Sequence, residues 1–239
     1  GENSTLDGDP FVIIANTLAV PGSKSELMLT LESEDGFADT IYFELQTRIS
    51  GENAPQGPDK YGYICYDDTD VDWLIAPEYD WVEINPEDRD RDFDGAVVEF
   101  ERESPHDIGE STVIELPFET EFYGTIYDHV TVCTKGFIAM GEQPRVTNYQ
   151  PFPMDLAIGG GVGMVAPFWA DIEFGDNGNI YTFYDDNQER YIIEWSRFRH
   201  FTEGDVDLTF QIILYNREVW VSENGDQQIL FQYHSIENH

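Results

Sequence analysis

The sequence predicts an all-β protein, an antiparallel β-sandwich of the jelly-roll or Ig-like type. Helical periodicity is almost absent along the 239 residues. In its place, short runs rich in β-branched and aromatic residues recur, and each ends at Gly, Asn, Asp or Pro, which is typical of strands joined by tight turns. A content of 41% hydrophobic and 14% aromatic residues is enough to bury a core. Such evenly spaced short strands favour a sandwich.

The expected strands differ in how clearly they are marked. Residues 25–31 and 40–47 alternate apolar and polar side chains, so that their apolar residues fall on one face. Two segments with an Asn-Gly pair, 176–179 and 223–226, are expected to be tight turns between strands. In chain order, strands are expected at residues 11–14, 25–31, 40–47, 61–66, 80–84, 96–100, 111–116, 130–140, 179–184, 191–198, 208–215 and 228–234.

A boundary between two parts of the chain is expected at residues 51–58, a linker with Gly and Pro breakers and no periodicity. Residues 1–50 are expected to form a short, partial Ig-like β segment, which would be only marginally stable alone. Residues 59–239 are expected to form the larger β-sandwich domain.

The chain is strongly acidic. Its 48 acidic residues against 12 basic ones give a net charge of −36. Such a surface repels nucleic acid and anionic lipid, so neither is expected as a partner, whereas it attracts divalent cations. No apolar run approaches the roughly 18 residues that a membrane-spanning helix needs, so no membrane insertion is expected. A solvated acidic surface and an adaptation to high salt both fit this composition.

No catalytic constellation stands out in the sequence. There is no Gly-x-Ser-x-Gly and no His-Glu-x-x-His motif. His129 and Cys133 stand four residues apart in an expected strand, which separates them by about 13 Å, too far for a hydrogen bond. The chain itself is therefore expected not to be an enzyme. Cys65 and Cys133 both fall in expected strands, where a small buried thiol is the usual outcome, and their spacing leaves a disulfide open.

The sharpest local signal is a candidate calcium site at residues 90–101, which match the twelve-residue calcium-loop template. The flanking runs look like strands, so Glu101 would lie about 23 Å from Asp94 unless residues 96–101 curl back. An acidic surface loop is the competing interpretation. The expected ligands are Asp90, Asp92, Asp94, the carbonyl group of Ala96, and Glu101.

A second acidic cluster comprises Asp67, Asp68, Asp70 and Asp72. Like charges at this density are costly unless they are solvated or neutralised by a cation. A solvated turn is the favoured interpretation, with calcium as the alternative.

Three aromatic residues are candidates for ligand binding. Trp220 lies between two valines beside a polar turn and is expected to be exposed. Tyr149 and Phe152 belong to a long apolar loop that is expected to be a contact surface.

Several blocks together resemble known extracellular domains. They are Tyr61-Gly-Tyr-Ile-Cys-Tyr-Asp-Asp-Thr-Asp-Val-Asp-Trp73, Leu116-Pro-Phe118, Phe122-Tyr-Gly124, Val130-Thr-Val-Cys-Thr-Lys-Gly-Phe-Ile-Ala-Met-Gly141 and Met164-Val-Ala-Pro-Phe-Trp-Ala-Asp171. Over residues 59–233 their order resembles the C-terminal β-rich region of gingipain-like and subtilisin-like secreted bacterial peptidases. The middle and last blocks are also similar to the extracellular domain of nidogen-type adhesion proteins, so residues 59–239 are expected to be a NIDO-like domain. Lys135 stands where that pattern usually has Asn, and we expect this change to alter surface chemistry.

The resemblance implies a function without chemistry of its own. It implies an extracellular, secreted or cell-surface location and a non-catalytic accessory module of a secreted bacterial peptidase. The module would give structural support or attach to a substrate or surface, with the parent peptidase's catalytic domain, a protein substrate or a surface glycan as partners. The alternative is an adhesin or carbohydrate-binding module of a bacterial surface protein. A stand-alone hydrolase is the third hypothesis.

Overall fold

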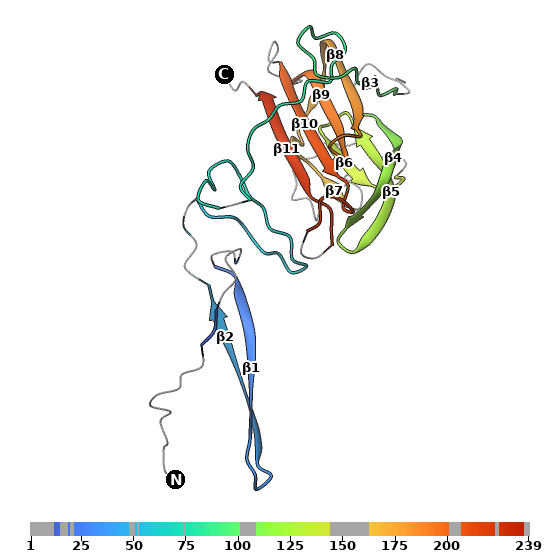
Figure 1. Ribbon diagram of the computed structural model, residues 1–239. Helices are drawn as coiled ribbons and strands as arrows, with labels where there is room; N and C mark the ends of the chain where they lie inside the picture. Colours follow the sequence, from blue (N-terminus) through green and yellow to red (C-terminus); the bar gives the residue numbers. More distant parts are fainter. Residues whose placement is uncertain are drawn as a thin grey trace. The chain divides into compact units, whose positions relative to one another are not determined.

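The structure is a computed structural model of the chain (Figure 1). It describes residues 12–14, 19, 22–47, 51, 53–73, 75–100, 109–143, 163–200, 207–222 and 225–236. Within these residues there are strands and turns but no helix, so the all-β prediction is confirmed. In this part of the chain no helix is long and apolar enough to cross a membrane. The chain divides into two units, Gly1–Glu78 and Tyr79–His239, which are described separately.

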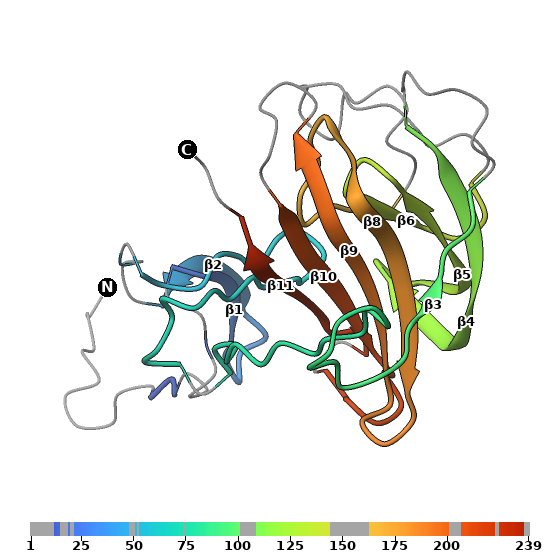
Figure 2. The same cartoon turned by 90° about the horizontal axis from the view of Figure 1, so that it is seen from above.

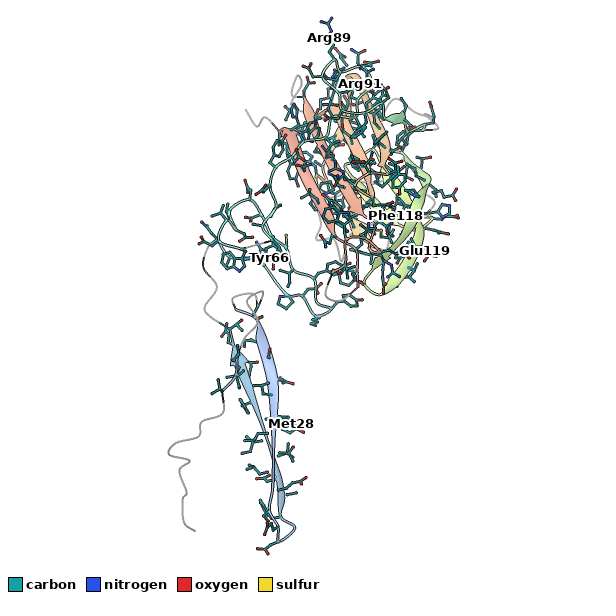
Figure 3. All side chains as sticks on the ribbon, in the orientation of Figure 1. Met28, Tyr66, Arg89, Arg91, Phe118 and Glu119 are labelled. Atoms are coloured by element: carbon teal, nitrogen blue, oxygen red, sulfur yellow. The ribbon has the colours of Figure 1, made fainter. Side chains whose placement is uncertain are left out.

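The first unit contains a two-stranded antiparallel ribbon. β1 (Lys24–Glu32) pairs with β2 (Ala38–Gln46), and Leu27 stands opposite Phe43. Facing residues of an antiparallel pair lie on the same side, so the ribbon has one apolar face, as the alternation in the sequence predicted. Met28 belongs to the other face and projects from β1 (Figure 3).

The strand predicted at residues 61–66 is absent, and the side chain of Asp59 explains why. Its carboxylate accepts hydrogen bonds from the backbone N–H groups of residues 61–63, at 2.9, 2.8 and 3.0 Å. Groups captured in this way are unavailable to a strand ladder. One isolated bridge, between Gln56 and Cys65, remains.

The second unit consists of two antiparallel sheets (Figures 1 and 2). One sheet has the strand order β11-β10-β9-β8-β3 and the other β4-β5-β6-β7. The first contains β3 (Ala96–Val97), β8 (Ile172–Asp185), β9 (Arg190–His200), β10 (Leu208–Tyr215) and β11 (Ile229–Ser235). The second contains β4 (Ser111–Phe122), β5 (Thr125–Cys133), β6 (Phe137–Met140) and β7 (Met164–Val165).

The main core lies between the two sheets. Val132 and Ile138 of the four-stranded sheet pack in one buried cluster with Ile193, Trp195 and Phe210 of the five-stranded sheet. The rings of Trp195 and Phe210 stack with centroids 5.2 Å apart, and the indole N–H of Trp195 donates to a main-chain carbonyl of the facing sheet at 3.0 Å. The β-sandwich prediction is therefore confirmed.

One predicted strand and one predicted turn are wrong. The run 130–140 is not one strand, because residues 134–136 turn the chain between β5 and β6. Residues 176–179 do not reverse the chain; they form an irregularity within β8. A Cβ at Gly178 would come within 2.4 Å of the carbonyl oxygen of Arg197, so this glycine serves a close approach of two backbones.

Residues 79–95, here called the strap, cover the outer face of the five-stranded sheet (Figure 1). The strap has no turn over residues 79–85, then turns over residues 86–93 and returns to residues 83 and 84. Val82 and Ile84 are buried there against Ile192 and Ile213. The strand predicted at residues 80–84 is wrong, because the strap crosses the sheet surface and joins no ladder there. The strand predicted from residue 96 shortens to β3.

Candidate functional site

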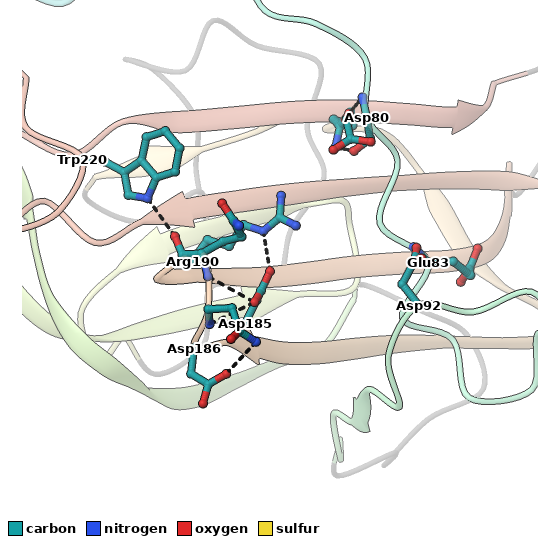
Figure 4. A network of polar contacts seen from close by, with 10 residues as sticks. Asp80, Glu83, Asp92, Asp185, Asp186, Arg190 and Trp220 are labelled. Atoms are coloured by element: carbon teal, nitrogen blue, oxygen red, sulfur yellow. Dashed lines mark hydrogen bonds and ion pairs between the residues drawn. The ribbon is translucent and has the colours of Figure 1, made fainter.

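Residues 219–221 form an exposed apolar surface, here called the ledge. Val219, Trp220 and Val221 have exposed fractions of 59%, 37% and 73%. Although exposed, the ring of Trp220 is fixed. Its N–H donates to the carbonyl oxygen of Gln188 at 2.8 Å (Figure 4). Its centroid lies 4.8 Å from that of Tyr215. The sequence-based expectation that Trp220 is exposed is met.

The turn between β8 and β9 holds the ledge in place. Asp185 is 2% exposed and accepts hydrogen bonds from Arg190 Nε at 2.9 Å and from the backbone N–H of Gln188 at 3.2 Å (Figure 4). The carbonyl group of Gln188 is thereby directed at Trp220. Glu189 also holds the segment before the ledge, because its carboxylate accepts a hydrogen bond from Asn216 Nδ2 at 3.0 Å. This hydrogen bond lowers the pKa of Glu189.

Tyr149 and Phe152, the other candidate ligand-binding residues, lie outside the described residues. Glu101 of the expected calcium loop does as well. For these three residues the sequence-based predictions remain predictions.

The three expected calcium-binding aspartates lie on the strap and are exposed. Asp92 uses a carboxylate oxygen to accept the backbone N–H of Glu83 at 3.0 Å, and Asp94 forms an ion pair with Arg91. The backbone N–H of Asp90 donates to the carboxylate of Asp88. In the described part of the chain no three His, Cys, Asp or Glu side chains gather closely enough to hold a metal ion. Ala96 is the first residue of β3. Calcium binding by the loop of residues 90–101 remains a prediction.

The second acidic cluster is a turn built from its own carboxylates. Asp70 is 2% exposed and accepts the backbone N–H of Asp67 at 2.8 Å. Asp67 accepts from both the N–H and the hydroxyl group of Thr69, and these hydrogen bonds lower the pKa of Asp67. Asp68 and Asp72 are exposed, which fits the favoured solvated turn.

A buried polar row beneath the strap was missed by the sequence analysis. Gln232 of β11, Gln211 of β10 and Glu194 of β9 stand opposite one another, and all three are at most 3% exposed. The side-chain amide of Gln232 accepts a hydrogen bond from the backbone N–H of Asp80 and donates one to its carbonyl oxygen, both at 2.8 Å. In the sequence, each of these three residues is a single polar residue within an apolar run. That pattern is the feature from which a buried polar residue could have been predicted. Only the register between strands shows that the three residues meet.

Glu194 faces a second carboxyl group, that of Glu83 on the strap. Burial raises the pKa of Glu194 well above its ordinary value, and the negative charge of Glu83 raises it further. One carboxyl oxygen of Glu194 accepts the backbone N–H of Ile84 at 3.4 Å, while the other has no hydrogen-bond partner in the described residues. Both amide atoms of the opposite residue, Gln211, also lack a partner there.

Lys135 is not a surface residue, which corrects the sequence-based expectation. It is 1% exposed, and its ammonium group donates to Asp171 Oδ1 at 2.9 Å and to the carbonyl oxygen of Ile172 at 3.0 Å. The ion pair ties the turn between β5 and β6 to the start of β8. Lys135 therefore contributes to packing and not to surface chemistry.

Neither cysteine is in a disulfide; Cys133 is buried and Cys65 is exposed. The expectation of a buried thiol is right for Cys133 and wrong for Cys65. Partial burial, followed by the charges of Asp67 and Asp70, raises the pKa of the Cys65 thiol. Nδ1 of His129 forms a hydrogen bond with Oδ1 of Asp128 at 2.8 Å.

Fold and sites together define an all-β sandwich module with a strapped outer sheet face and a fixed, exposed aromatic ledge. The model of the NIDO-related family matches residues 95–234, more than half of the chain, and the chain belongs to that family. Domains of this kind are typically extracellular. Searches of curated proteins and of solved structures found no match.

Proposed function

We propose that this chain is a non-catalytic extracellular module that attaches its parent protein to a substrate or a surface. The observation that carries the proposal is the ledge, where three consecutive apolar residues are exposed on a fixed turn. Membership of the NIDO-related family supports an extracellular setting.

The geometry of the ledge suits attachment. A large aromatic ring that is already held in place loses little conformational entropy on binding, so more of its contact energy becomes affinity. Trp220 is held by Gln188 and Tyr215 while a third of its surface stays open. Its open surface and the two flanking valines form an apolar contact of the kind that anchors protein or sugar ligands.

Binding of the purified chain to a glycan array and to immobilised candidate protein substrates tests the proposal. Trp220→Ala is expected to remove most of the binding, because it deletes the ring without touching the core. Tyr42→Ala is the matched control: Tyr42 is an exposed aromatic residue on β2, with an exposed fraction of 73%. Equal loss in both variants, or binding unchanged by Trp220→Ala, would reject the ledge as the attachment surface.

We further propose that the parent protein is a secreted bacterial peptidase. The support is the order of sequence blocks over residues 59–233, which resembles the region that follows the catalytic domain in such enzymes. The upstream part of the same gene is expected to encode a Cys/His or Ser/His/Asp catalytic domain. Deleting this chain from that protein should slow cleavage of insoluble substrates and leave cleavage of a soluble peptide unchanged.

An adhesin or carbohydrate-binding module of a surface protein is the second candidate. The exposed indole of Trp220 favours it specifically, because indole rings stack on sugar faces. Glycan binding together with an upstream region that has no catalytic domain would decide for this candidate. Peptide or glycoside turnover by the chain alone would contradict both.

A further inference from the structure

We propose that the strap is a pH-sensitive cover whose docking on the five-stranded sheet depends on a proton held by Glu194. The proposal goes beyond the attachment function and does not rest on it. Glu194 lies on β9, is 0% exposed, and contacts the strap at the backbone N–H of Ile84.

The position of the proton follows from the partners of the two carboxyl groups. Both oxygens of Glu83 already accept hydrogen bonds, one from the backbone N–H of Asn85 at 2.9 Å and one from the indole N–H of Trp81 at 3.1 Å. Glu194 faces Glu83, and one of its carboxyl oxygens accepts no hydrogen bond from the described residues. Two carboxylates can approach in this way without repulsion only if one is protonated, and the buried Glu194 is that one.

The elements around Glu194 supply no compensating positive charge among the described residues. On the strap, Glu83 is the charge that acts on Glu194. On β8 the residue opposite is Tyr181, and on β10 it is Gln211, both of which are uncharged at neutral pH. Arg197 is the nearest cation along β9, but it is paired with Glu87 of the strap at 3.6 Å.

Two other acidic residues of the strap, Asp92 and Asp80, make contacts away from Glu194. Asp92 accepts the backbone N–H of Glu83, and Asp80 is clamped through its backbone by Gln232. On β11, His234 contacts the ring of Trp81 at 5.0 Å between centroids. Glu194 is therefore the group beneath the strap whose charged form is opposed both by burial and by a neighbouring carboxylate.

The sign of the pH dependence follows from the raised pKa of Glu194 in the docked state. When the strap lifts, Glu194 meets water and its pKa returns toward the ordinary value. Docking is therefore strongest below that ordinary value and weakens as the pH rises through the docked-state pKa. One proton is released on opening, so the ratio of lifted to docked strap rises by at most about tenfold per pH unit.

Hydrogen exchange measured by mass spectrometry, corrected for the intrinsic pH dependence of exchange, tests the proposal on the full chain. Protection of the strap amides is expected to fall as the pH rises from the ordinary pKa of a glutamate through the raised pKa of Glu194, with the slope given above. Glu194→Gln should flatten this slope and increase protection at neutral pH. Glu119→Gln is the matched control, because Glu119 is exposed on β4 of the other sheet and its loss changes the net charge equally (Figure 3). An unchanged slope in Glu194→Gln would overturn the proposal.

A second measurement does not depend on that variant folding. The infrared carbonyl band of a protonated carboxylic acid is expected in the wild-type chain above about pH 6, where ordinary Asp and Glu are ionised. Glu83→Gln removes the neighbouring charge, so the band should then disappear at a lower pH. Absence of the band in the wild-type chain, or no shift in Glu83→Gln, would contradict a protonated Glu194.

Discussion

Lys135 carries one of the few positive charges of this acidic chain into its interior. Its ammonium group satisfies the carbonyl group of Ile172 as well as pairing with Asp171. Lys135→Met keeps the volume of the side chain but leaves that buried carbonyl without its donor, which costs roughly 1–3 kcal/mol. The free energy of unfolding, measured in urea, is expected to fall by that amount.

Asp171→Asn separates the two roles of Lys135. Asp171 is partly exposed, so its charge has access to water and the ion pair contributes little. Asp171→Asn is expected to change the unfolding free energy by less than about 1 kcal/mol. A larger loss in Asp171→Asn than in Lys135→Met would show that the ion pair, not the bond to Ile172, fixes the turn.

Asp92 tests calcium binding at the loop of residues 90–101. If the loop binds calcium, EDTA lowers the melting temperature of the wild-type chain, because an ion bound only to the folded state stabilises it. Asp92→Ala lowers the melting temperature by itself, since it removes the acceptor for the backbone N–H of Glu83. The informative quantity is therefore the EDTA difference, which should vanish in Asp92→Ala.

Asp186→Ala is the control for calcium, because Asp186 is an exposed aspartate of the turn between β8 and β9. It should keep the full EDTA difference. No effect of EDTA on the wild-type chain at low ionic strength would reject calcium at this loop.

At the scale of elements, the turn between β5 and β6 depends on Gly136. Its φ is 79°, and a Cβ there would lie 2.0 Å from the carbonyl oxygen of Phe168. Gly136→Ala is expected to cost more than about 3 kcal/mol, because the backbone itself must move. Gly225→Ala is the matched control, since its φ is 85° and nothing lies within 4 Å of its Cβ position.

Urea unfolding of both variants measures the difference. Gly225→Ala should cost roughly 1–2 kcal/mol, the penalty of a positive φ alone. Equal costs in the two variants would mean that the approach of residues 164–171 to the turn does not constrain it.

Sequence patterns located most strands, and the exceptions have physical causes. β1, β2, β9, β10 and β11 follow runs whose apolar content or alternation is continuous. The run 61–66 is also rich in aromatic residues, yet the carboxylate of Asp59, two residues upstream, accepts hydrogen bonds from the N–H groups of residues 61–63. The run 80–84 is extended and buried, but it packs across a sheet instead of pairing with it. Composition alone does not distinguish these outcomes.

The candidate sites were predictable to different degrees. The exposure of Trp220 could be predicted because its neighbours mark a turn. The meeting of Glu194 with Gln211 and Gln232 depends on the register of three strands and on a strap from another part of the chain. A glutamate within Tyr-Ile-Ile-Glu-Trp normally indicates the wet face of a strand, and here the strap covers that face.

At the scale of the whole molecule, the net charge of −36 opposes compaction. Added salt screens this repulsion, since the Debye length falls from about 10 Å at 0.1 M to about 3 Å at 1 M. The melting temperature is therefore expected to rise with NaCl over that range, measured in EDTA so that calcium does not contribute. Sucrose separates screening from general solvent exclusion: it should stabilise the chain equally at low and high salt. A melting temperature that falls steadily with NaCl would mean that ion pairs such as Arg190–Asp185 outweigh the repulsion between the many unpaired carboxylates.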